Sequence, residues 1–442
     1  MIDKTREIAL KILYEIDTKK GYSNIVLNEY INKNKEKLTN RDIGLISEII
    51  YGVTTWKLTI DEIIKKHSKI KIKKISDWIL NILRMGIFQI IFLDKIPKSA
   101  AVNESVNLAK RYGHKSSSNY VNAILRKVDK KDYEELFEIK DEIEKISKTL
   151  SMPRWIIEEL IKDQKDIKKV EKICKELNKK PKTTIRRNNL KIAKEEFEKM
   201  LEEKNYKYEK SKINEDFYII DKVKNIENQE EFQKGYYTIQ DISAGLSAKY
   251  LEPKKGEKIL DACSAPGGKT TYIAELMENE GEIEAWDIYK SRTNLIEENA
   301  KRLGITIIKT KINDASKYDE EKKEKFDKIL LDVPCLGIGV IKRKPDIKWQ
   351  RKQEDIEKIS KIQIEILKTC SKYLKENGKI IYSTCSILKE ENEKNINRFI
   401  EQNKEFEIEK IEGKDFINIL PNENQDGFFI AKLIKKQKNK KQ

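Results

Sequence analysis

The chain has 442 residues, of which 38% are hydrophobic and 38% charged, and its mean hydropathy is −0.69. This composition indicates a globular protein of two to four domains, since one domain typically holds about 150 residues. Two histidines and five scattered cysteines offer little for a zinc centre, so we expect no metal site. The odd cysteine number and the lack of an apparent secretory signal predict free thiols in a reducing cytoplasm.

The net charge of +16 is unevenly distributed along the chain. Residues 1–130 hold 25 Lys and Arg against 14 Asp and Glu, which is most of the whole excess. A lysine-rich chain is also what an AT-rich genome produces, but codon usage alone would not concentrate the surplus in one segment. The distribution therefore favours an N-terminal domain that binds a polyanion.

Residues 1–130 are predicted to be all helical, followed by a helical linker over 131–150. Amphipathic spacing supports helices at 5–16, 99–113 and 116–128. The most apolar segment, 77–94, contains Asn81, Arg84 and Gln89 and is too short and polar to span a bilayer. We predict that it forms a buried central helix.

Residues 151–235 show a mixed pattern that predicts a small α+β domain. The expected elements are helices at 153–163 and 191–205, a strand at 182–188 and short strands near 206–221. The domain is almost neutral and lacks the paired aromatic residues of an RNA-recognition sheet. We interpret it as a spacer or a substrate-orienting module.

Residues 236–442 alternate apolar runs with helical patterns, which is typical of parallel strands joined by crossover helices. The runs are KILDAC, EIEAWD, TIIKTKIND, KILLDVPC and GKIIYSTC. We therefore predict a Rossmann-like α/β domain. Ligands of such sheets bind beyond the carboxyl ends of the strands, where several of these runs carry an Asp or a Cys.

The stretch ILDACSAPGGKTTYIAEL, residues 259–276, places a glycine-rich turn between a strand and a helix. A Walker-A phosphate loop would need glycine at position 263, which is Cys, so this interpretation fails. A nucleoside cofactor without phosphates fits better, and S-adenosylmethionine is the common one. Asp287 is placed to accept hydrogen bonds from ribose hydroxyls, and Asp314 from the amine of adenine. Either could instead be a solvent-facing residue.

Two strand ends carry a cysteine, Cys335 in DVPC and Cys385 in STC. A thiolate is the strongest nucleophile that this chain offers, and Asp332 lies three residues before Cys335. Cys174 and Cys370 fall within helical patterns and are expected to be structural. Cys263 is expected to line the cofactor turn.

The motifs DACSAPGGKT, DVPCLGIGV with KRKPDIKW, YSTCSILKEENE and NQDGFFIAKL resemble those of RNA cytosine carbon-5 methyltransferases. Residues 1–130 resemble the NusB-like RNA-binding domain of the bacterial 16S ribosomal RNA branch, often called Sun or RsmB, whose target is cytosine 967. The resemblance implies that Cys385 attacks the base, that Asp332 binds the ring at nitrogen-3 and that Cys335 assists release. It implies cofactor-binding positions at Cys263, Ser264, Ala265, Pro266, Gly267, Gly268, Lys269, Asp287, Asp314 and Asp332.

Several alternatives remain open at this point. In DNA cytosine methyltransferases the Pro-Cys cysteine, which corresponds in type to Cys335, is the nucleophile. The RNA target could be a transfer RNA, or the chain could be a non-catalytic RNA-binding adaptor. As partner we expect 16S ribosomal RNA, either free or in an assembling small subunit, with no DNA and no membrane, and we expect a monomer.

Overall fold

The computed structural model describes residues 3–221 and 226–437. The chain divides into two compact units, one of Met1–Asn178 with Ile341–Gln353 and one of Lys179–Val340 with Glu354–Gln442. No helix within the described ranges is long and apolar enough to cross a membrane. Each unit is considered by itself below.

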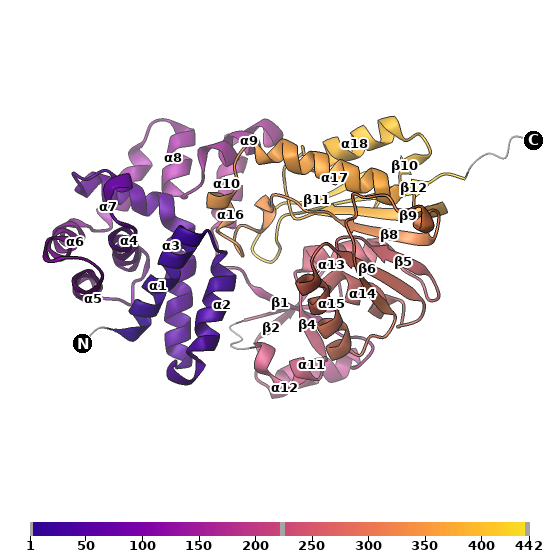
Figure 1. The fold of residues 1–442 in the computed structure, drawn as a ribbon, viewed down its shortest axis with the longest axis horizontal. Coiled ribbons are helices and arrows are strands. Elements are labelled where there is room, and N and C mark those ends of the chain that lie inside the picture. The colour runs from indigo at the N-terminus through magenta and orange to yellow at the C-terminus, as the bar shows by residue number, and fades with distance from the viewer. Residues whose placement is uncertain (1–2, 222–225, 438–442) are drawn as a thin grey trace, which may run out of the picture. The chain divides into compact units, whose positions relative to one another are not determined.

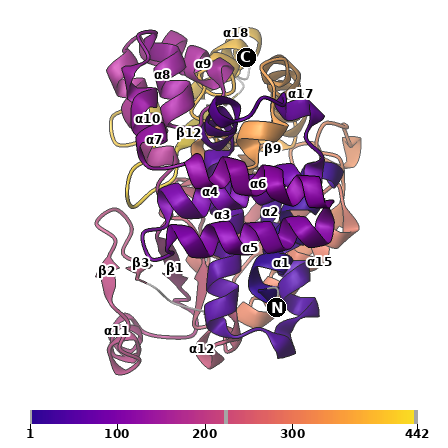
Figure 2. The same ribbon diagram turned by 90° about the vertical axis from the view of Figure 1, so that its left-hand side faces the viewer.

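The first unit is helical, as the sequence predicts (Figure 1). Helices α4, α5 and α6 pack side by side, and α4 also contacts α1 and α3 (Figure 2). The unit extends beyond the expected 1–130 domain through α8, α9 and α10. Its principal helices are α1 (Lys4–Lys19), α2 (Ser23–Lys33), α3 (Asn40–His67), α4 (Asp77–Phe92), α5 (Lys98–Tyr112), α6 (Lys115–Lys127), α7 (Lys131–Glu134), α8 (Glu142–Thr149), α9 (Arg154–Gln164) and α10 (Ile167–Leu177).

Helix α4 is the predicted central helix, and every residue from Ile79 to Ile91 is buried. Its polar side chains are satisfied internally, because a buried polar group without a partner would be costly. Arg84 donates two hydrogen bonds to Asp61 and one to Asp17, and the amide of Gln89 donates to the carbonyl of Met85. Paired polar groups thus interrupt an otherwise apolar helix without exposing it.

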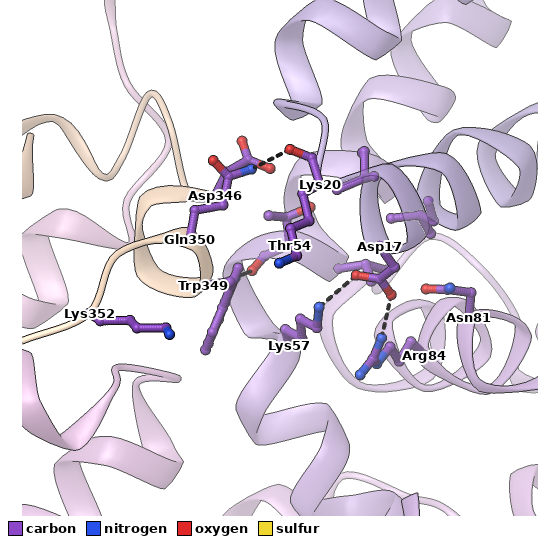
Figure 3. Close-up of a pocket in the computed structure, with 13 residues that line it drawn as sticks. Asp17, Lys20, Thr54, Lys57, Asn81, Arg84, Asp346, Trp349, Gln350 and Lys352 are labelled. Carbon is purple, nitrogen blue, oxygen red and sulfur yellow. Dashed lines mark hydrogen bonds and ion pairs between the residues drawn. The ribbon is translucent and has the colours of Figure 1, made fainter. Parts of the chain in front are cut away.

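The segment Ile341–Gln353, which follows the Cys335 motif in sequence, packs within the helical unit. Asp346 accepts hydrogen bonds from the backbone N–H and the hydroxyl of Ser23, at the start of α2. The short helix α16 (Ile347–Gln350) carries Trp349, whose indole N–H donates to the carbonyl of Thr54. Trp349 and Lys57 line a pocket of about 420 Å³ in this unit (Figure 3).

The second unit begins with a small antiparallel sheet of order β2-β3-β1-β4. In its core, Phe197 of helix α11 packs against Tyr218 and Tyr237 of the sheet. The predicted mixture of strands and helices is therefore confirmed for this part of the chain. The elements are β1 (Thr183–Arg187), α11 (Lys194–Glu203), β2 (Tyr208–Lys210), β3 (Phe217–Ile220), α12 (Glu230–Gln233) and β4 (Tyr237–Ile239).

The large sheet has the order β10-β12-β9-β8-β5-β6-β7, and β11 pairs with β12. The five runs identified in the sequence form β5 to β9, which pair in parallel, so the predicted Rossmann-like domain is confirmed. The strands are β5 (Lys258–Asp261), β6 (Glu282–Asp287), β7 (Ile308–Ile312), β8 (Phe326–Asp332), β9 (Leu374–Thr384), β10 (Phe406–Ile408), β11 (Phe416–Ile419) and β12 (Phe428–Lys435). The main helices are α13 (Ile242–Tyr250), α14 (Gly268–Leu276), α15 (Lys290–Leu303), α17 (Asp355–Ser371) and α18 (Glu393–Gln402).

Candidate active site

The candidate site lies at the carboxyl ends of the parallel strands. Strands β8 and β5 are neighbours, and β9 pairs with β8 on its other side. Because parallel strands end at the same edge of a sheet, the residues that follow them are brought together. Asp261, Asp332 and Cys385 lie at or directly after the ends of β5, β8 and β9.

The two strand-end cysteines are in contact, with their sulfur atoms 2.8 Å apart. Cys335 lies in the loop after β8 and Cys385 directly follows β9. The hydrogen bond with Cys385, together with burial, raises the pKa of the Cys335 thiol well above its usual value. Cys335 is therefore a protonated thiol at neutral pH, able to donate a hydrogen bond to the sulfur of Cys385.

Asp332 is held beside this pair by two donors. The hydroxyl of Ser383 donates to Oδ1 at 2.9 Å, and the Lys269 ammonium lies 2.7 Å from Oδ2. Burial alone would lower the pKa of Lys269, but the Asp332 carboxylate raises it above its usual value. Lys269, the lysine of the PGGKT turn, is thus a charged partner of Asp332.

A buried carboxylate that the sequence analysis did not identify connects both cysteine loops. Glu391 accepts hydrogen bonds from the backbone N–H of Leu336, next to Cys335, and from the hydroxyl of Ser386, next to Cys385. Its place in the YSTCSILKEENE motif, close to Cys385, could have indicated a role for Glu391. The sequence alone, however, does not show whether the side chain of a loop glutamate faces the interior or the solvent. Glu391 is fully buried, so it fixes the two loops relative to each other.

The glycine-rich turn is tied to the neighbouring strand β6. Both the backbone N–H and the hydroxyl of Ser264 donate to the carbonyl of Trp286, at 2.9 and 2.8 Å. The Ala265–Pro266 peptide bond is cis. Gly267 has φ +98°, a left-handed conformation that favours glycine, and α14 begins at the next residue. Cys263 precedes the turn and is partly exposed.

Asp261 lies beneath this turn and is fully buried. Burial raises the pKa of its carboxyl to about 7, although a hydrogen bond from the hydroxyl of Thr270, at 2.6 Å from Oδ2, opposes the shift. Thr270 belongs to the first turn of α14. Asp261 therefore links the end of β5 to the start of the helix that follows the turn.

Asp287 and Asp314 extend the site along the sheet edge. Asp287 ends β6 and accepts a hydrogen bond from the backbone of Tyr289, whereas Asp314 accepts from the backbone and hydroxyl of Ser316. The hydrogen bond from the Ser316 hydroxyl lowers the pKa of Asp314, which is thus ionised at neutral pH. Two acceptors of the predicted kind therefore lie at the ends of adjacent strands.

Three further features beside Asp287 suit a nucleoside. Ile288 and Tyr289 are 51% and 57% exposed, so they offer apolar surface next to Asp287. The amide nitrogen of Asn313, whose backbone N–H donates to the carbonyl of Asp287, is buried without a hydrogen-bond partner among the described residues. Exposed apolar surface, an unmatched donor and strand-end carboxylates fit the purine and ribose of S-adenosylmethionine. Lys269 is paired with Asp332, so its ammonium is not held ready for a phosphate group.

The remaining cysteines are structural, as predicted from their helical patterns. Cys174 lies in α10 and Cys370 in α17, and both are fully buried. Burial raises the pKa of the Cys174 thiol to about 12 and shifts that of Cys370 in the same direction. Neither thiol is available as a nucleophile at neutral pH.

Comparisons with known proteins agree with this architecture. Residues 3–130 match the NusB family, residues 152–227 the Methyltr_RsmF/B-like ferredoxin-like domain, and residues 248–434 the model described as 16S rRNA methyltransferase RsmB/F. The predicted combination of a NusB-like domain, a small α+β domain and a methyltransferase domain is thereby confirmed.

Whole-chain relatives lead to the same family. The chain is 36% identical to a probable ribosomal RNA small subunit methyltransferase B of Bacillus subtilis, over 98% of each chain. It is 31% identical to ribosomal RNA small subunit methyltransferase B of Escherichia coli O127:H6, over 91% of this chain and 92% of that one. The crystal structure of PH0851 matches with a TM-score of 0.82 at 27% identity, covering 98% of this chain and 99% of that chain. The chain therefore belongs to the RsmB/F family of S-adenosylmethionine-dependent 16S rRNA methyltransferases.

Proposed function

We propose that this protein methylates carbon-5 of a cytosine in 16S ribosomal RNA through a covalent bond between Cys385 and the base. The observation that carries the proposal is the contact between Cys385 and Cys335 beside the Asp332–Lys269 ion pair. The relatives named ribosomal RNA small subunit methyltransferase B support the choice of substrate.

The first chemical step activates the base. Carbon-5 of cytosine is a poor nucleophile, so the Cys385 thiolate adds to carbon-6 and moves the electron pair of the 5,6 double bond towards carbon-5. Negative charge then develops at nitrogen-3, where Asp332 forms a hydrogen bond. The Lys269 ammonium, 2.7 Å from Asp332, gives a proton to the carboxylate in this step, and the resulting Asp332 O–H donates the hydrogen bond to nitrogen-3.

The cofactor supplies an electrophilic methyl group on a sulfonium. The residues that would hold it are those of the turn and of the strand ends described above. They are Cys263, Ser264, Ala265, Pro266, Gly267, Gly268, Lys269, Asp287, Asp314 and Asp332.

The last step releases the enzyme. Once carbon-5 carries the methyl group, its proton leaves to solvent water, the electron pair restores the 5,6 double bond, and the bond from carbon-6 to sulfur breaks. The raised pKa keeps Cys335 protonated, so its thiol can donate to the departing Cys385 sulfur 2.8 Å away. This division of roles favours Cys385 as nucleophile and Cys335 as the assisting group.

On the motif resemblance alone we propose cytosine 967 as the target, and the base must be presented unstacked, which is easiest in a loop of the RNA. We propose that the substrate is 16S ribosomal RNA, free or in an assembling small subunit, and that the enzyme acts as a monomer in the cytoplasm.

Bisulfite sequencing of total RNA from a deletion strain tests this proposal. We expect one 5-methylcytosine of 16S ribosomal RNA to be lost and to return when the wild-type gene is restored. A mark lost from transfer RNA, with 16S ribosomal RNA unchanged, would replace the proposed substrate. Failure of the purified protein to bind S-adenosylmethionine in a calorimeter would favour a non-catalytic adaptor instead.

A further inference from the structure

A fully buried arginine of the small antiparallel sheet contacts the helix that follows the glycine-rich turn. Arg186 lies in β1 and its side chain is completely inaccessible to solvent. It pairs with Glu275 of α14, which is also buried, across 89 residues of sequence. Both residues belong to the second compact unit, and their elements β1 and α14 are labelled in Figure 1.

Every N–H group of the Arg186 guanidinium has an acceptor. Nε and one Nη donate to the two carboxylate oxygens of Glu275 at 3.1 and 2.7 Å, and the same Nη donates to the Thr271 hydroxyl at 3.1 Å. The other Nη donates to the carbonyl of Gly268 at 2.8 Å and to the side-chain carbonyl of Gln240. Arginine has five such donors in a rigid plane, so this set fixes both its position and its orientation.

The acceptors are concentrated on α14. Gly268, Thr271 and Glu275 all belong to this helix, and the Arg186 guanidinium also lies 4.6 Å from the ring centroid of its Tyr272. Three of these partners are spaced so that they share one face of the helix over two turns. Arg186 therefore restrains α14 in both translation and rotation, which a single salt bridge would not do.

The restrained end of α14 is the functional end. Gly268 is the first residue of the helix, directly after Gly267 with its left-handed backbone, and Lys269, the next residue, reaches Asp332. Gln240, which accepts from Arg186, lies against Gly268, since a Cβ atom there would be 3.7 Å from the Gln240 amide carbon. A shift of the helix start would displace the turn and the Lys269 ammonium together.

The neighbouring arginine provides a natural contrast. Arg187 is also largely buried and also pairs with a carboxylate, donating to Asp216 at 2.7 Å and to the carbonyl of Ile192. Neither of these partners belongs to α14, although Asp216 also accepts a hydrogen bond from the hydroxyl of Tyr272 of that helix at 3.0 Å. Two adjacent arginines of one strand thus make similar bonds, but only Arg186 makes them to the helix that carries the turn.

We propose that Arg186 is a positioning residue for the cofactor turn, and that the small α+β domain serves through it to hold the start of α14 in its binding conformation. This inference rests on the proposed function in placing the cofactor at the turn. Arg186 acts through Gly268 and Gln240 and need not touch the cofactor. The middle domain accordingly contributes to cofactor affinity in addition to any role in orienting RNA.

The test compares Arg186→Met with the matched control Arg187→Met. We expect Arg186→Met to weaken S-adenosylmethionine binding at least about tenfold by calorimetry, because misplacing a binding element by a fraction of an ångström is costly. In the protein without cofactor, the hydrogen–deuterium exchange of peptides that span residues 264–276 should be faster in this variant than in the wild type. Arg187→Met should leave the cofactor affinity and the exchange of these peptides near their wild-type values, even if it lowers the melting temperature as much as Arg186→Met does.

Two further variants keep the test informative. Arg186→Lys retains the charge but brings three donors on one nitrogen, so we expect only partial recovery of affinity. Gln240→Ala removes one acceptor without leaving a carboxylate unpaired, and it should weaken binding by a smaller factor if Arg186→Met fails to fold. RNA affinity should stay unchanged in all folded variants.

The inference is overturned if folded Arg186→Met binds S-adenosylmethionine like the wild type, or if Gln240→Ala does so when Arg186→Met cannot be obtained folded. Equal losses in the Arg186 and Arg187 variants would also overturn it, because they would indicate general destabilisation. A wild-type protein that does not bind the cofactor would instead remove the proposed function, on which the inference rests.

Discussion

The sulfur atoms of Cys335 and Cys385 lie 2.8 Å apart, after the ends of the neighbouring parallel strands β8 and β9. Glu391 holds the loops that carry them by bonds to Leu336 and Ser386. At this distance a proton can be shared directly between the two sulfur atoms, as the proposed roles of Cys385 as nucleophile and Cys335 as assisting thiol require.

The two cysteines are therefore expected to give opposite phenotypes. Cys385→Ala should lower methyl transfer at least about a thousandfold, since the nucleophile is lost. In Cys335→Ala the Cys385 sulfur should still attack the base but should be released slowly, so a covalent protein–RNA adduct should accumulate. Methyl incorporation from labelled cofactor measures the first effect, and denaturing electrophoresis of enzyme mixed with RNA and cofactor measures the second.

Cys370→Ala is the control for these variants, because it removes a buried thiol of α17 that contacts the carbonyl of Ala315 and neither Cys335 nor Cys385 among the described residues. It should form no more trapped adduct than the wild type. An adduct that accumulates with Cys385→Ala in place of Cys335→Ala would exchange the roles of the two residues. Turnover at the native rate without both thiols would exclude the covalent mechanism.

The Lys269–Asp332 pair is expected to act on the chemical step. Lys269→Met removes the ammonium 2.7 Å from Asp332, and kcat should fall by about 10² to 10³, as for other groups that stabilise developing charge. Asp332→Asn keeps the shape of the side chain but not its charge, and its kcat should fall by a factor in the same range. Steady-state kinetics with saturating RNA and cofactor measure kcat, while Lys290→Met, an exposed lysine of α15, serves as control. An unchanged kcat in Lys269→Met would mean that the pair is only structural.

The architecture of the catalytic domain could be predicted because its strands are local signals. Each parallel strand is a short apolar run bounded by a turn, and an Asp or Cys at its end marks the edge of the candidate site, as with Asp287 and Cys385. Strand direction is not encoded in such a run. FFIAKL has the same pattern, yet it forms β12, which pairs with β9 in antiparallel orientation.

The contacts that could not be predicted are polar and distant in sequence. Arg186 and Glu275 are 89 residues apart, and each alone resembles an ordinary surface charge. Lys348, in a charged segment that looks solvated, is buried in the helical unit. Burial of such groups depends on partners that only the folded chain brings together, and composition carries no information on those partners.

The basic N-terminal unit is expected to bind RNA through the segment between α3 and α4. Lys69, Lys71 and Lys73 are exposed there, whereas Lys65 and Lys66 are engaged by carboxylates. Reversing the three exposed lysines to Glu should weaken RNA binding and reduce the slope of log K against log salt by about 0.7 to 0.9 per lost phosphate contact. Filter binding at several salt concentrations measures the slope.

The control for this surface is a second set of three exposed lysines on α10 in the same unit, namely Lys168, Lys169 and Lys172. Their reversal changes the net charge equally, so any difference between the two sets reports the location of the contacts. Equal effects on the salt slope would indicate attraction by net charge alone. An unchanged slope in the first set would show that the segment does not touch phosphates.

Lys348 is expected to make the stability of the helical unit depend on pH. Its Nζ donates to the carbonyls of Thr55 and Ser151 and to the side chain of Asn178, and no carboxylate of the described residues contacts it. Burial lowers the pKa of Lys348 to about 7. In the unfolded chain a lysine titrates near 10.4. Between these values the unfolded state binds a proton that the folded state does not, so stability rises with pH.

The comparison is between the wild type and Lys348→Met, which cannot titrate at this position. The difference in unfolding free energy, wild type minus variant, should increase between pH 7 and pH 9.5 by at most about 1.4 kcal/mol per pH unit. Urea unfolding followed by tryptophan fluorescence, to which Trp349 in the same cluster contributes, measures it. Lys69→Met, an exposed lysine, should show no such trend. A difference that stays constant with pH would mean that the three oxygen acceptors keep Lys348 protonated in the folded state, and burial would then not govern its charge.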